Sequence, residues 1–318
     1  MLLDVLFCGV CHSDIHQARD EWGGSIFPMV PGHEIVGRVA KTGVKVTRFK
    51  KGDLAGIGCL VDSCRVCDPC KHDVEQFCEK GPAATYNGTE MDKKTKTYGG
   101  YSTRITVTES FALKIPAGLD LAGAAPLLCA GITTFSPLRQ YGCKKGDKVA
   151  VVGLGGLGHM AVKLAAAMGA EVTVLSTSRS KEQDARRLGA HGFESTKEDG
   201  TFKKLRGRFD LIVDTISAPH DYNKYLGTLR VKGTMVVVGA PPAPTPVAAF
   251  ALIGGNKRLA GSAIGGIAET QEMLDFCAQH KLVSDIEVIP VQKINEAYER
   301  MLKGDVRYRF VIDAASLG

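Results

Sequence analysis

The chain has 318 residues, of which 44% are hydrophobic and 23% are charged, and this is enough for two domains with buried cores. Its net charge of +6 is small and not clustered, which argues against a nucleic-acid partner, and no apolar run is long enough to span a membrane. The opening MLLDVLFCGV lacks a basic start and contains Asp4, so we do not expect a signal peptide. Ten cysteines in such a chain favour metal binding or catalysis over disulfides and predict a cytoplasmic protein.

Residues 1 to about 117 have the pattern of a compact β domain. They are rich in Gly, Pro, Val and Thr, show no long helical period, and contain strand-like runs at Ile35–Ala40, Lys45–Phe49 and Tyr101–Val107. Leu2–Phe7 also predicts a strand, with no opening strand before it to pair with.

Within this domain four cysteines follow the spacing C-x2-C-x2-C-x7-C. They are Cys64, Cys67, Cys70 and Cys78. Four thiolates at such short steps can surround one ion, and a complete tetrahedral set leaves no open position, so we predict a structural zinc site. An iron–sulfur cluster is the competing interpretation because its ligand spacings overlap, but nothing else in the chain suggests electron transfer.

From residue 118 to 265, strand-like and helix-like stretches alternate, which predicts βαβ winding and a doubly wound parallel sheet. The expected strands cover 148–152, 171–175, 210–214 and 234–238, and the expected helices cover 156–168, 180–188 and 220–229. The tail returns to mixed character, with helices expected near 268–279 and 294–302 and a final strand at 308–312.

The stretch 147–168, DKVAVVGLGGLGHMAVKLAAAM, joins a run of β-formers to apolar residues at helical spacing. Between the two stands a glycine series, Gly153, Gly155 and Gly158. In a strand–turn–helix context this series predicts that a dinucleotide pyrophosphate binds at the helix N-terminus. An ordinary turn of a parallel sheet is the alternative.

Three further candidate residues are dispersed along the chain: Cys11 in GVCHSD, His33 in VPGHE and Cys129 in PLLCAG. Each is unremarkable alone, since a lone cysteine in apolar surroundings usually belongs to the core. Together they supply two thiolates and one imidazole, which is the Cys2His donor set of alcohol dehydrogenase, in which a fourth position stays open for catalysis.

Six stretches together resemble the zinc-dependent medium-chain alcohol dehydrogenases, and most of all the cinnamyl alcohol dehydrogenase-like reductases. They are GVCHSDIH, VPGHEIVG, the four-cysteine segment, LLCAGITTFSPL, GLGGLGHMAVKLA and RYRFVID. The resemblance runs from Leu2 to Asp313. It implies a GroES-like β-rich catalytic domain, residues 1–117 and 266–318, and a Rossmann NADP-binding domain, residues 118–265. Relatives carry about one more strand pair before Leu2, so we expect the stability of this chain to differ from theirs.

The resemblance also implies roles for single residues. Cys11, His33 and Cys129 would hold a catalytic zinc, with Glu34 as an alternate ligand or neighbour, and Ser13 and His16 match the proton relay. The coenzyme would contact residues of the glycine loop and of LLCAGITTFSPL, namely Gly153, Gly155, Gly156, Leu157, Gly158 and Thr133. The family pattern further implies a homodimer and reversible hydride transfer between NADP(H) and an aldehyde/alcohol pair.

The residues that follow the second expected strand of the parallel sheet indicate which coenzyme binds. An NAD site has an acidic residue there to hold the ribose 2′-hydroxyl. This chain instead has the sequence STSRSK, in which Ser176, Thr177, Ser178 and Lys181 suit a 2′-phosphate. We therefore predict NADP(H), with two zinc ions as further cofactors.

Two other functions stay open at this stage. A zinc-free quinone or enone reductase of the same superfamily shares the glycine loop but gives the cysteines no purpose, and a non-catalytic nucleotide-binding protein is the third interpretation. We expect an aromatic or long-chain substrate, with Trp22 lining the pocket, although core packing of Trp22 or Phe27 is an equal alternative.

Overall fold

A computed structural model describes all residues, 1–318, and divides into two compact units. The first unit comprises Met1–Ile132 and Ile264–Gly318, and the second comprises Thr133–Ala263. Residues 118–132, expected in the second domain, therefore belong to the first. The reason is that α3 (Leu121–Ala124) and η3 (Ala125–Leu128) are almost wholly buried and pack on strands of the first unit.

The first unit is built on a seven-stranded sheet with the order β14-β15-β1-β2-β3-β7, and β6 also pairs with β1. The strands are β1 (Leu2–Val10), β2 (Ile35–Lys41), β3 (Leu54–Ile57), β6 (Arg104–Thr106), β7 (Leu113–Lys114), β14 (Ile286–Pro290) and β15 (Arg309–Asp313). The segment expected as an unpaired opening strand, β1, thus lies inside the sheet, with β2 on one side and β6 and β15 on the other.

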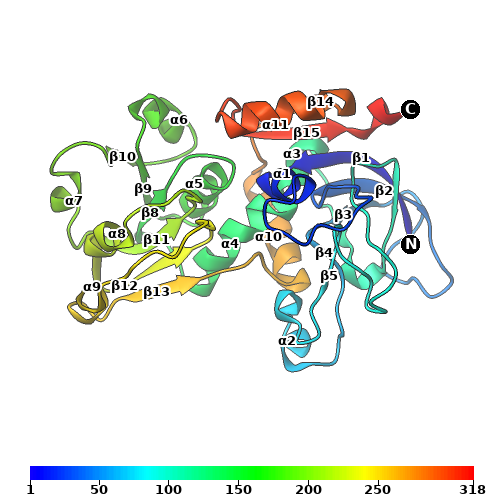
Figure 1. Ribbon diagram of the computed structural model, residues 1–318, viewed down its shortest axis with the longest axis horizontal. Helices are drawn as coiled ribbons and strands as arrows, with labels where there is room; N and C mark the ends of the chain where they lie inside the picture. The colour runs from blue at the N-terminus through cyan, green and yellow to red at the C-terminus, as the bar shows by residue number, and fades with distance from the viewer. The chain divides into compact units, whose positions relative to one another are not determined.

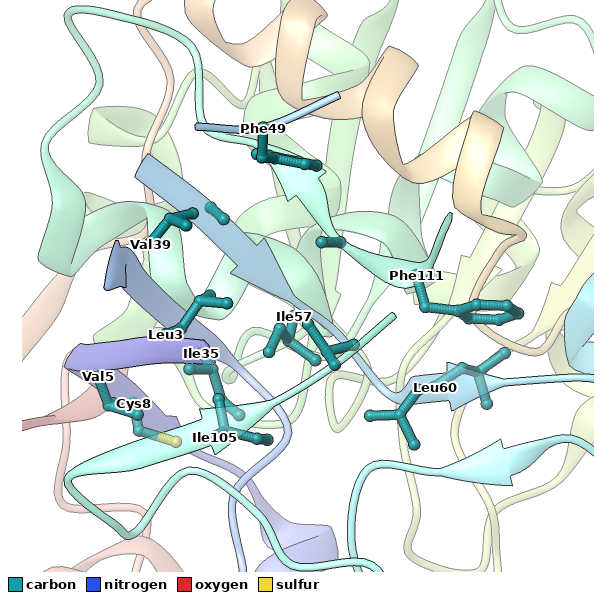
Figure 2. Close-up of a cluster of buried hydrophobic side chains, with 14 of the residues drawn as sticks. Leu3, Val5, Cys8, Ile35, Val39, Phe49, Ile57, Leu60, Ile105 and Phe111 are labelled. Carbon is teal, nitrogen blue, oxygen red and sulfur yellow. The ribbon is translucent and has the colours of Figure 1, made fainter. Parts of the chain in front are cut away.

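The core of the first unit lies against this sheet and is shown in Figure 2. Leu3, Ile35 and Ile57 come from β1, β2 and β3, and each is 0% exposed. Phe49 and Phe111 enter the same cluster from the connecting segments. Truncation of such a buried Leu or Ile to Ala typically costs about 2–5 kcal/mol, so this cluster fixes the strand ends on which the candidate site is built.

Short helices and a small lobe complete the first unit. The helices are α1 (His12–Ala18), α10 (Ile267–His280) and α11 (Ile294–Leu302), with short turns η2 (Glu109–Phe111), η5 (Val291–Lys293) and η6 (Ala314–Leu317). The lobe contains β4 (Leu60–Asp62), β5 (Ala83–Ala84), α2 (Asp68–Lys71) and η1 (Glu75–Phe77). In Figure 1 its α2 end (cyan) projects away from the sheet of its own unit.

The second unit is a six-stranded parallel sheet with the order β10-β9-β8-β11-β12-β13, visible as a row of strands in Figure 1. The strands are β8 (Lys148–Val152), β9 (Glu171–Ser176), β10 (Gly192–Ser195), β11 (Phe209–Asp214), β12 (Leu229–Val237) and β13 (Arg258–Gly261). In chain order this is 3-2-1-4-5-6, the strand order of dinucleotide-binding sheets. The expected doubly wound sheet is confirmed.

The second unit's helices are α5 (Gly158–Ala167), α6 (Glu182–Arg187), α7 (Thr201–Lys204), α8 (Tyr222–Thr228) and α9 (Ala249–Ile253), with η4 (Arg179–Lys181) before α6. Another helix, α4 (Ala130–Gln140), crosses the boundary between the units in sequence. No single helix is long and apolar enough to cross a membrane. One pair of helices, Leu121–Leu128 and Ala130–Gln140, bent by 58°, has the length and composition of a membrane span. The core helices of globular proteins also meet this criterion.

One expected strand, Lys45–Phe49, is wrong. The backbone N–H groups of Thr47 and Arg48 donate to a side chain, the Glu109 carboxylate, at 3.0 and 2.7 Å instead of to a neighbouring strand. The alternating pattern came from Phe49, whose side chain is buried in the core from an irregular segment. Three short strands were also missed: β10 and β13, with four residues each, and β14, with five.

Candidate metal and coenzyme sites

The sheet of the first unit brings four dispersed side chains together. Cys11 follows β1, whereas His33 and Glu34 directly precede β2. These strands are antiparallel, with Cys8 opposite Ile35, so the end of one lies beside the start of the other. Cys129 follows η3, which packs on β1 and β2. The ligand atoms of Cys11, His33, Glu34 and Cys129 all lie within 4.8 Å of one another.

Asp14 holds this cluster in place, although it was not singled out from the sequence. Its carboxylate is 0% exposed and accepts from Cys11 N at 2.8 Å, Gly32 N at 3.2 Å and the Tyr101 hydroxyl at 3.1 Å. Its Oδ1 lies 3.4 Å from His33 Nδ1, which leaves His33 Nε2 as the ring nitrogen available to a metal. Burial lowers the pKa of His33, but Cys59 and Asp14 raise it well above its ordinary value overall.

Glu34 and Arg309 form a buried ion pair beside the thiols. Glu34 is 0% exposed and Arg309 is 4% exposed, and Arg309 Nη2 donates to Glu34 Oε1. The other carboxylate oxygen, Oε2, is buried and has no hydrogen-bond partner. Burial raises the pKa of Glu34 to about 7, although Arg309 opposes that rise. A Cβ at position 9 would collide with Oε2, so Gly9 is required there.

The donor set fits zinc. Two sulfurs and one imidazole nitrogen are a ligand set that zinc takes in catalytic sites, where the fourth position stays open, and a carboxylate oxygen is also a zinc ligand in proteins. The hydrogen bond from Cys129 lowers the pKa of the Cys11 thiol well below its usual value, and the same contact raises that of Cys129. A cation would stabilise both thiolates and the buried Glu34 carboxylate, one oxygen of which has no hydrogen-bond partner.

The two expected relay residues lie on α1. Ser13 Oγ is 3.6 Å from Cys11 Sγ. His16 is three positions further along the helix; its Nδ1 lies 2.5 Å from Glu21 Oε2 and its ring stacks on Trp22 with centroids 4.7 Å apart. Trp22 and Phe27 are each 56% exposed, so the core-packing alternative is wrong for both.

The second cysteine group closes on itself in the projecting lobe. Cys70 Sγ lies 3.9 Å from Cys64 Sγ and 3.4 Å from Cys67 Sγ, and Cys67 Sγ lies 4.0 Å from Cys78 Sγ. Backbone N–H groups of Val66 and Cys67 lower the pKa of Cys64 to about 6. All four sulfurs lie within 4.8 Å of one another, which is the arrangement of a closed four-thiolate zinc site.

The glycine loop of the second unit joins β8 to α5. Gly153 has a φ of +89°, which a residue with a side chain rarely adopts, and a Cβ on Gly158 would collide with the Gly153 carbonyl. A Cβ on Gly155 would meet nothing within 4 Å. The fold therefore requires Gly153 and Gly158, whereas Gly155 leaves open space at the N-terminus of α5 where a pyrophosphate would bind. Gly156 and Leu157 complete the loop, and Leu157 precedes the first residue of α5.

The turn after β9 lies against this glycine loop. Lys181 Nζ donates to the Leu154 carbonyl at 2.9 Å. Ser176 is 6% exposed and its Oγ accepts from Ser178 N at 3.3 Å. Arg179 donates to both oxygens of Glu198 at 2.5 and 2.6 Å. Glu171, at the start of β9, pairs with Arg208 at 3.1 Å, away from the strand's carboxyl end.

Of the remaining expected residues, Thr177 lies in the same turn and is exposed, and Thr133 is 8% exposed in α4. The sequence interpretation missed Asp14, Arg309, Tyr101 and Cys59. Arg309 carried a usable signal, because it opens the apolar strand RFVID and an arginine there is buried only with an acidic partner.

Comparison with known proteins agrees with this geometry. Residues 1–117 match the family described as alcohol dehydrogenase GroES-like domain, and residues 156–279 match the family described as zinc-binding dehydrogenase. The chain is 55% identical over 317 residues to the probable formaldehyde dehydrogenase AdhA of Bacillus subtilis, covering 100% of this chain and 90% of that protein. It is 56% identical over 315 residues to the NADP-dependent alcohol dehydrogenase C 1 of Mycolicibacterium smegmatis, covering 99% and 90%.

Among solved structures, a cinnamyl alcohol dehydrogenase of Sorghum bicolor superposes with a TM-score of 0.96 at 46% identity, over 99% of this chain and 90% of that one. These matches span both units, and they agree with the two cysteine groups and the glycine loop. The chain therefore belongs to the zinc-dependent medium-chain alcohol dehydrogenases, within their cinnamyl alcohol dehydrogenase-like subgroup.

Proposed function

We propose that this chain is a zinc enzyme that uses NADP(H) to interconvert aldehydes and primary alcohols. The observation that supports this most is the buried cluster of two thiols, an imidazole and the Glu34 carboxylate, one oxygen of which has no hydrogen-bond partner. A buried carboxylate without a full set of partners costs several kcal/mol, and a zinc ion would offset that cost. The reaction follows from the family, since one relative is named an NADP-dependent alcohol dehydrogenase.

Cys11, His33 and Cys129 would hold the catalytic zinc, with Glu34 as a further ligand or neighbour. When bound, zinc supplies Lewis acidity toward a carbonyl or hydroxyl oxygen. Asp14 keeps the His33 ring oriented, and its own carboxylate is fixed by backbone N–H groups. Arg309 balances the charge of Glu34, so that the cluster keeps its geometry in an apolar interior.

A proton must leave a buried site when an alcohol is oxidised. Ser13 lies beside Cys11 and its hydroxyl both donates and accepts, so it can pass that proton on. His16 is 30% exposed on the same helix, so its imidazole can accept the proton and release it to solvent. Its contact with Glu21 leaves Nε2 as the nitrogen that can accept.

The coenzyme would bind to the second unit. Gly153, Gly155 and Gly158 admit the pyrophosphate, and the turn that carries Ser176 and Lys181 would take the 2′-phosphate of NADP(H). The absence of an acidic residue at the carboxyl end of β9 supports this choice over NAD(H). Thr133 would contact the coenzyme from α4.

The substrate would carry an aromatic or long apolar group. A small cavity of about 10 Å3, room for about one water, lies beside Leu128, the residue before Cys129. Its wall includes Leu60, Leu113, Ile132 and Ile264. Trp22, which is 56% exposed and stacks on His16, offers an aromatic surface on which such a group would pack.

The active protein would be a cytoplasmic homodimer. β13 is an edge strand of the second unit's sheet, and α9, which precedes it in the chain, exposes Phe250 and Ile253 by 81% and 66%. A second copy placed edge to edge would pair the strand and cover these side chains. Light scattering that gives twice the chain mass for wild type and the monomer mass for Phe250→Glu would support the dimer; a monomeric wild type would contradict it.

The test is an aldehyde screen with NADPH, run together with zinc analysis. The series runs from formaldehyde through straight-chain aldehydes to cinnamaldehyde, since relatives are named for formaldehyde and cinnamyl alcohol. We expect kcat/KM to rise with apolar size and two zinc ions per chain, one for each cluster. A zinc-free protein that reduces quinones or enones, or one that turns over no aldehyde, would overturn the proposal.

A further inference from the structure

A buried ion pair stands at the carboxyl end of β11, outside every site described above. Asp214 ends β11 and is 0% exposed, and His220 is 11% exposed, with His220 Nε2 2.9 Å from Asp214 Oδ2. β11 pairs with β8, the strand that leads into the glycine loop. Ligands of open parallel sheets bind at the carboxyl ends of the strands where the strand order reverses, which here lies beside β8.

The segment between Asp214 and His220 forms a wall against the glycine loop. Thr215 Oγ1 donates to the Val152 carbonyl at 2.7 Å, directly before Gly153. A Cβ on Gly153 would lie 3.0 Å from Thr215 Oγ1 and 3.1 Å from Ile216 Cγ1. The position of residues 215–218 therefore determines how much space is left for the coenzyme on this side of the glycine loop.

His220 closes this segment by bonding at both ring nitrogens. Its Nδ1 lies 2.8 Å from the carbonyl of Ala218, and its Nε2 faces the Asp214 carboxylate, whose other oxygen accepts from Ile216 N at 3.2 Å. Carbonyl and carboxylate oxygens only accept, so each ring nitrogen needs a hydrogen to complete both bonds. The protonated imidazolium makes both; the neutral ring makes one.

The surroundings of the ring favour the charged form. The charged groups that act on it are Asp214 from β11 and Asp221 at the start of α8, both acidic. The rings of Tyr222 and Tyr225 cover it edge-on, with centroids 4.9 and 5.5 Å away. Burial lowers the pKa of His220, but the bonds to Asp214 and Ala218 outweigh burial, and the pKa is raised overall.

We infer that His220 is a positioning residue for coenzyme binding: its doubly protonated ring ties Ala218 to Asp214 and so holds residues 215–218 against the glycine loop. This rests on the proposed use of NADP(H). Because the folded protein raises the pKa of His220, the clamp is complete below the ordinary histidine pKa of about 6.5 and is lost as pH rises through the folded value. Coenzyme affinity should fall over the same range.

The experiment measures the Kd of NADPH by the enhancement of coenzyme fluorescence, from pH 6 to 9.5, in the zinc-loaded protein. We compare wild type with His220→Gln, and use His280→Gln, an exposed site in the first unit, as the matched control. Wild type and control should weaken about tenfold across the titration, whereas His220→Gln should be weak throughout and nearly flat. Titration of the 2′-phosphate affects all three proteins alike and cancels in the ratio. At saturating coenzyme, kcat should stay within about twofold while KM for NADPH rises.

Imidazole NMR of wild type, with His220→Gln used to assign the resonance, should give a titration midpoint above that of an exposed histidine. Asp214→Asn should lower this midpoint, and it replaces His220→Gln as the test variant if His220→Gln folds poorly. Identical Kd profiles for wild type and His220→Gln, or a neutral ring at pH 6.5, would overturn the role of His220. Failure of wild type to bind NADPH at any pH would overturn the proposed function and this inference with it.

Discussion

At the scale of single residues, the chain places charged groups in its interior only where each has a partner. Asp14 is surrounded by donors, and Glu34 shares one oxygen with Arg309. Removing one member of such a buried pair costs about 3–5 kcal/mol, because the other charge is left uncompensated. Within the buried Glu34–Arg309 pair, Glu34 Oε2 and Arg309 Nε have no hydrogen-bond partner, and the Glu34 carboxylate lies beside the thiols.

Coenzyme choice should respond in opposite directions to two substitutions on one turn. Ser176→Asp should favour NADH, because a carboxylate repels the 2′-phosphate and accepts from free ribose hydroxyls. Glu198→Gln should favour NADPH further, because it releases Arg179 from its two bonds to Glu198. One or two charge-assisted hydrogen bonds are worth about 1.5–3 kcal/mol each, so we expect shifts of about tenfold or more.

The measurement is the ratio of kcat/KM for NADPH and NADH at a fixed aldehyde concentration. A wild type that prefers NADH, or ratios that neither substitution moves, would show that the turn after β9 does not read the 2′-phosphate.

Sequence reasoning at this scale reached the residues whose chemistry is legible in a short motif. The spacing of the cysteines and of the glycine series makes both recognisable in the sequence, and the structure brings each set together. The partners of Asp14, Arg309 and His220 were out of reach because they lie 19, 275 and 6 positions away, although the apolar strand around Arg309 indicated that this arginine is buried with an acidic partner. Sequence spacing does not reveal which buried charge meets which.

At the scale of elements, the glycines between β8 and α5 have different roles: Gly158 is needed for folding, and Gly155 for coenzyme binding. Gly155→Ala should leave the melting temperature unchanged, since a Cβ there meets nothing within 4 Å, yet weaken NADPH binding about tenfold or more by filling the phosphate space. Gly158→Ala should lower the melting temperature and binding together, because its Cβ meets the Gly153 carbonyl.

The measurements are the melting temperature, by thermal unfolding, and the Kd of NADPH, by titration, for both alanine variants. Equal destabilisation by the two substitutions, or normal coenzyme affinity in Gly155→Ala, would contradict these separate roles.

The cysteine lobe should behave as a folding element and not as part of the chemistry. Cys67→Ser removes one of four thiolates, so we expect one zinc fewer and a melting temperature lower by about 5–10 °C, from a loss of a few kcal/mol. Turnover below that temperature should be largely kept. Cys143→Ser, outside both clusters, is the control. An unchanged melting temperature with one zinc lost would contradict the role of the lobe as a folding element.

Element types were more predictable than their edges. The parallel strands β8, β9, β11 and β12 appear where apolar runs predicted them, because burial on both faces leaves a continuous apolar signal. Lys45–Phe49 misled because Phe49 enters the core from an irregular segment. The unit boundary at Ile132 was missed because α3 and η3 are apolar on all sides, and such helices belong to whichever sheet buries them.

At the scale of the whole molecule, the candidate metal ligands belong to the first unit and the candidate coenzyme loop to the second. Cys11, His33, Glu34 and Cys129 all lie within Met1–Ile132, and the glycine loop lies within Thr133–Ala263. Loss of the catalytic metal should therefore leave coenzyme binding nearly intact, because the residues that would hold each belong to separate units.

The most direct test measures zinc content, NADPH affinity and aldehyde turnover on the same samples of wild type and Cys129→Ser. We predict two zinc ions per chain in wild type, one for each cluster, and one in the variant. Turnover should fall by about three orders of magnitude or more, in line with loss of a catalytic metal's charge stabilisation, while the Kd of NADPH changes less than about twofold. Near-normal turnover by Cys129→Ser with one zinc fewer would contradict the assignment of Cys11, His33 and Cys129 to the catalytic metal.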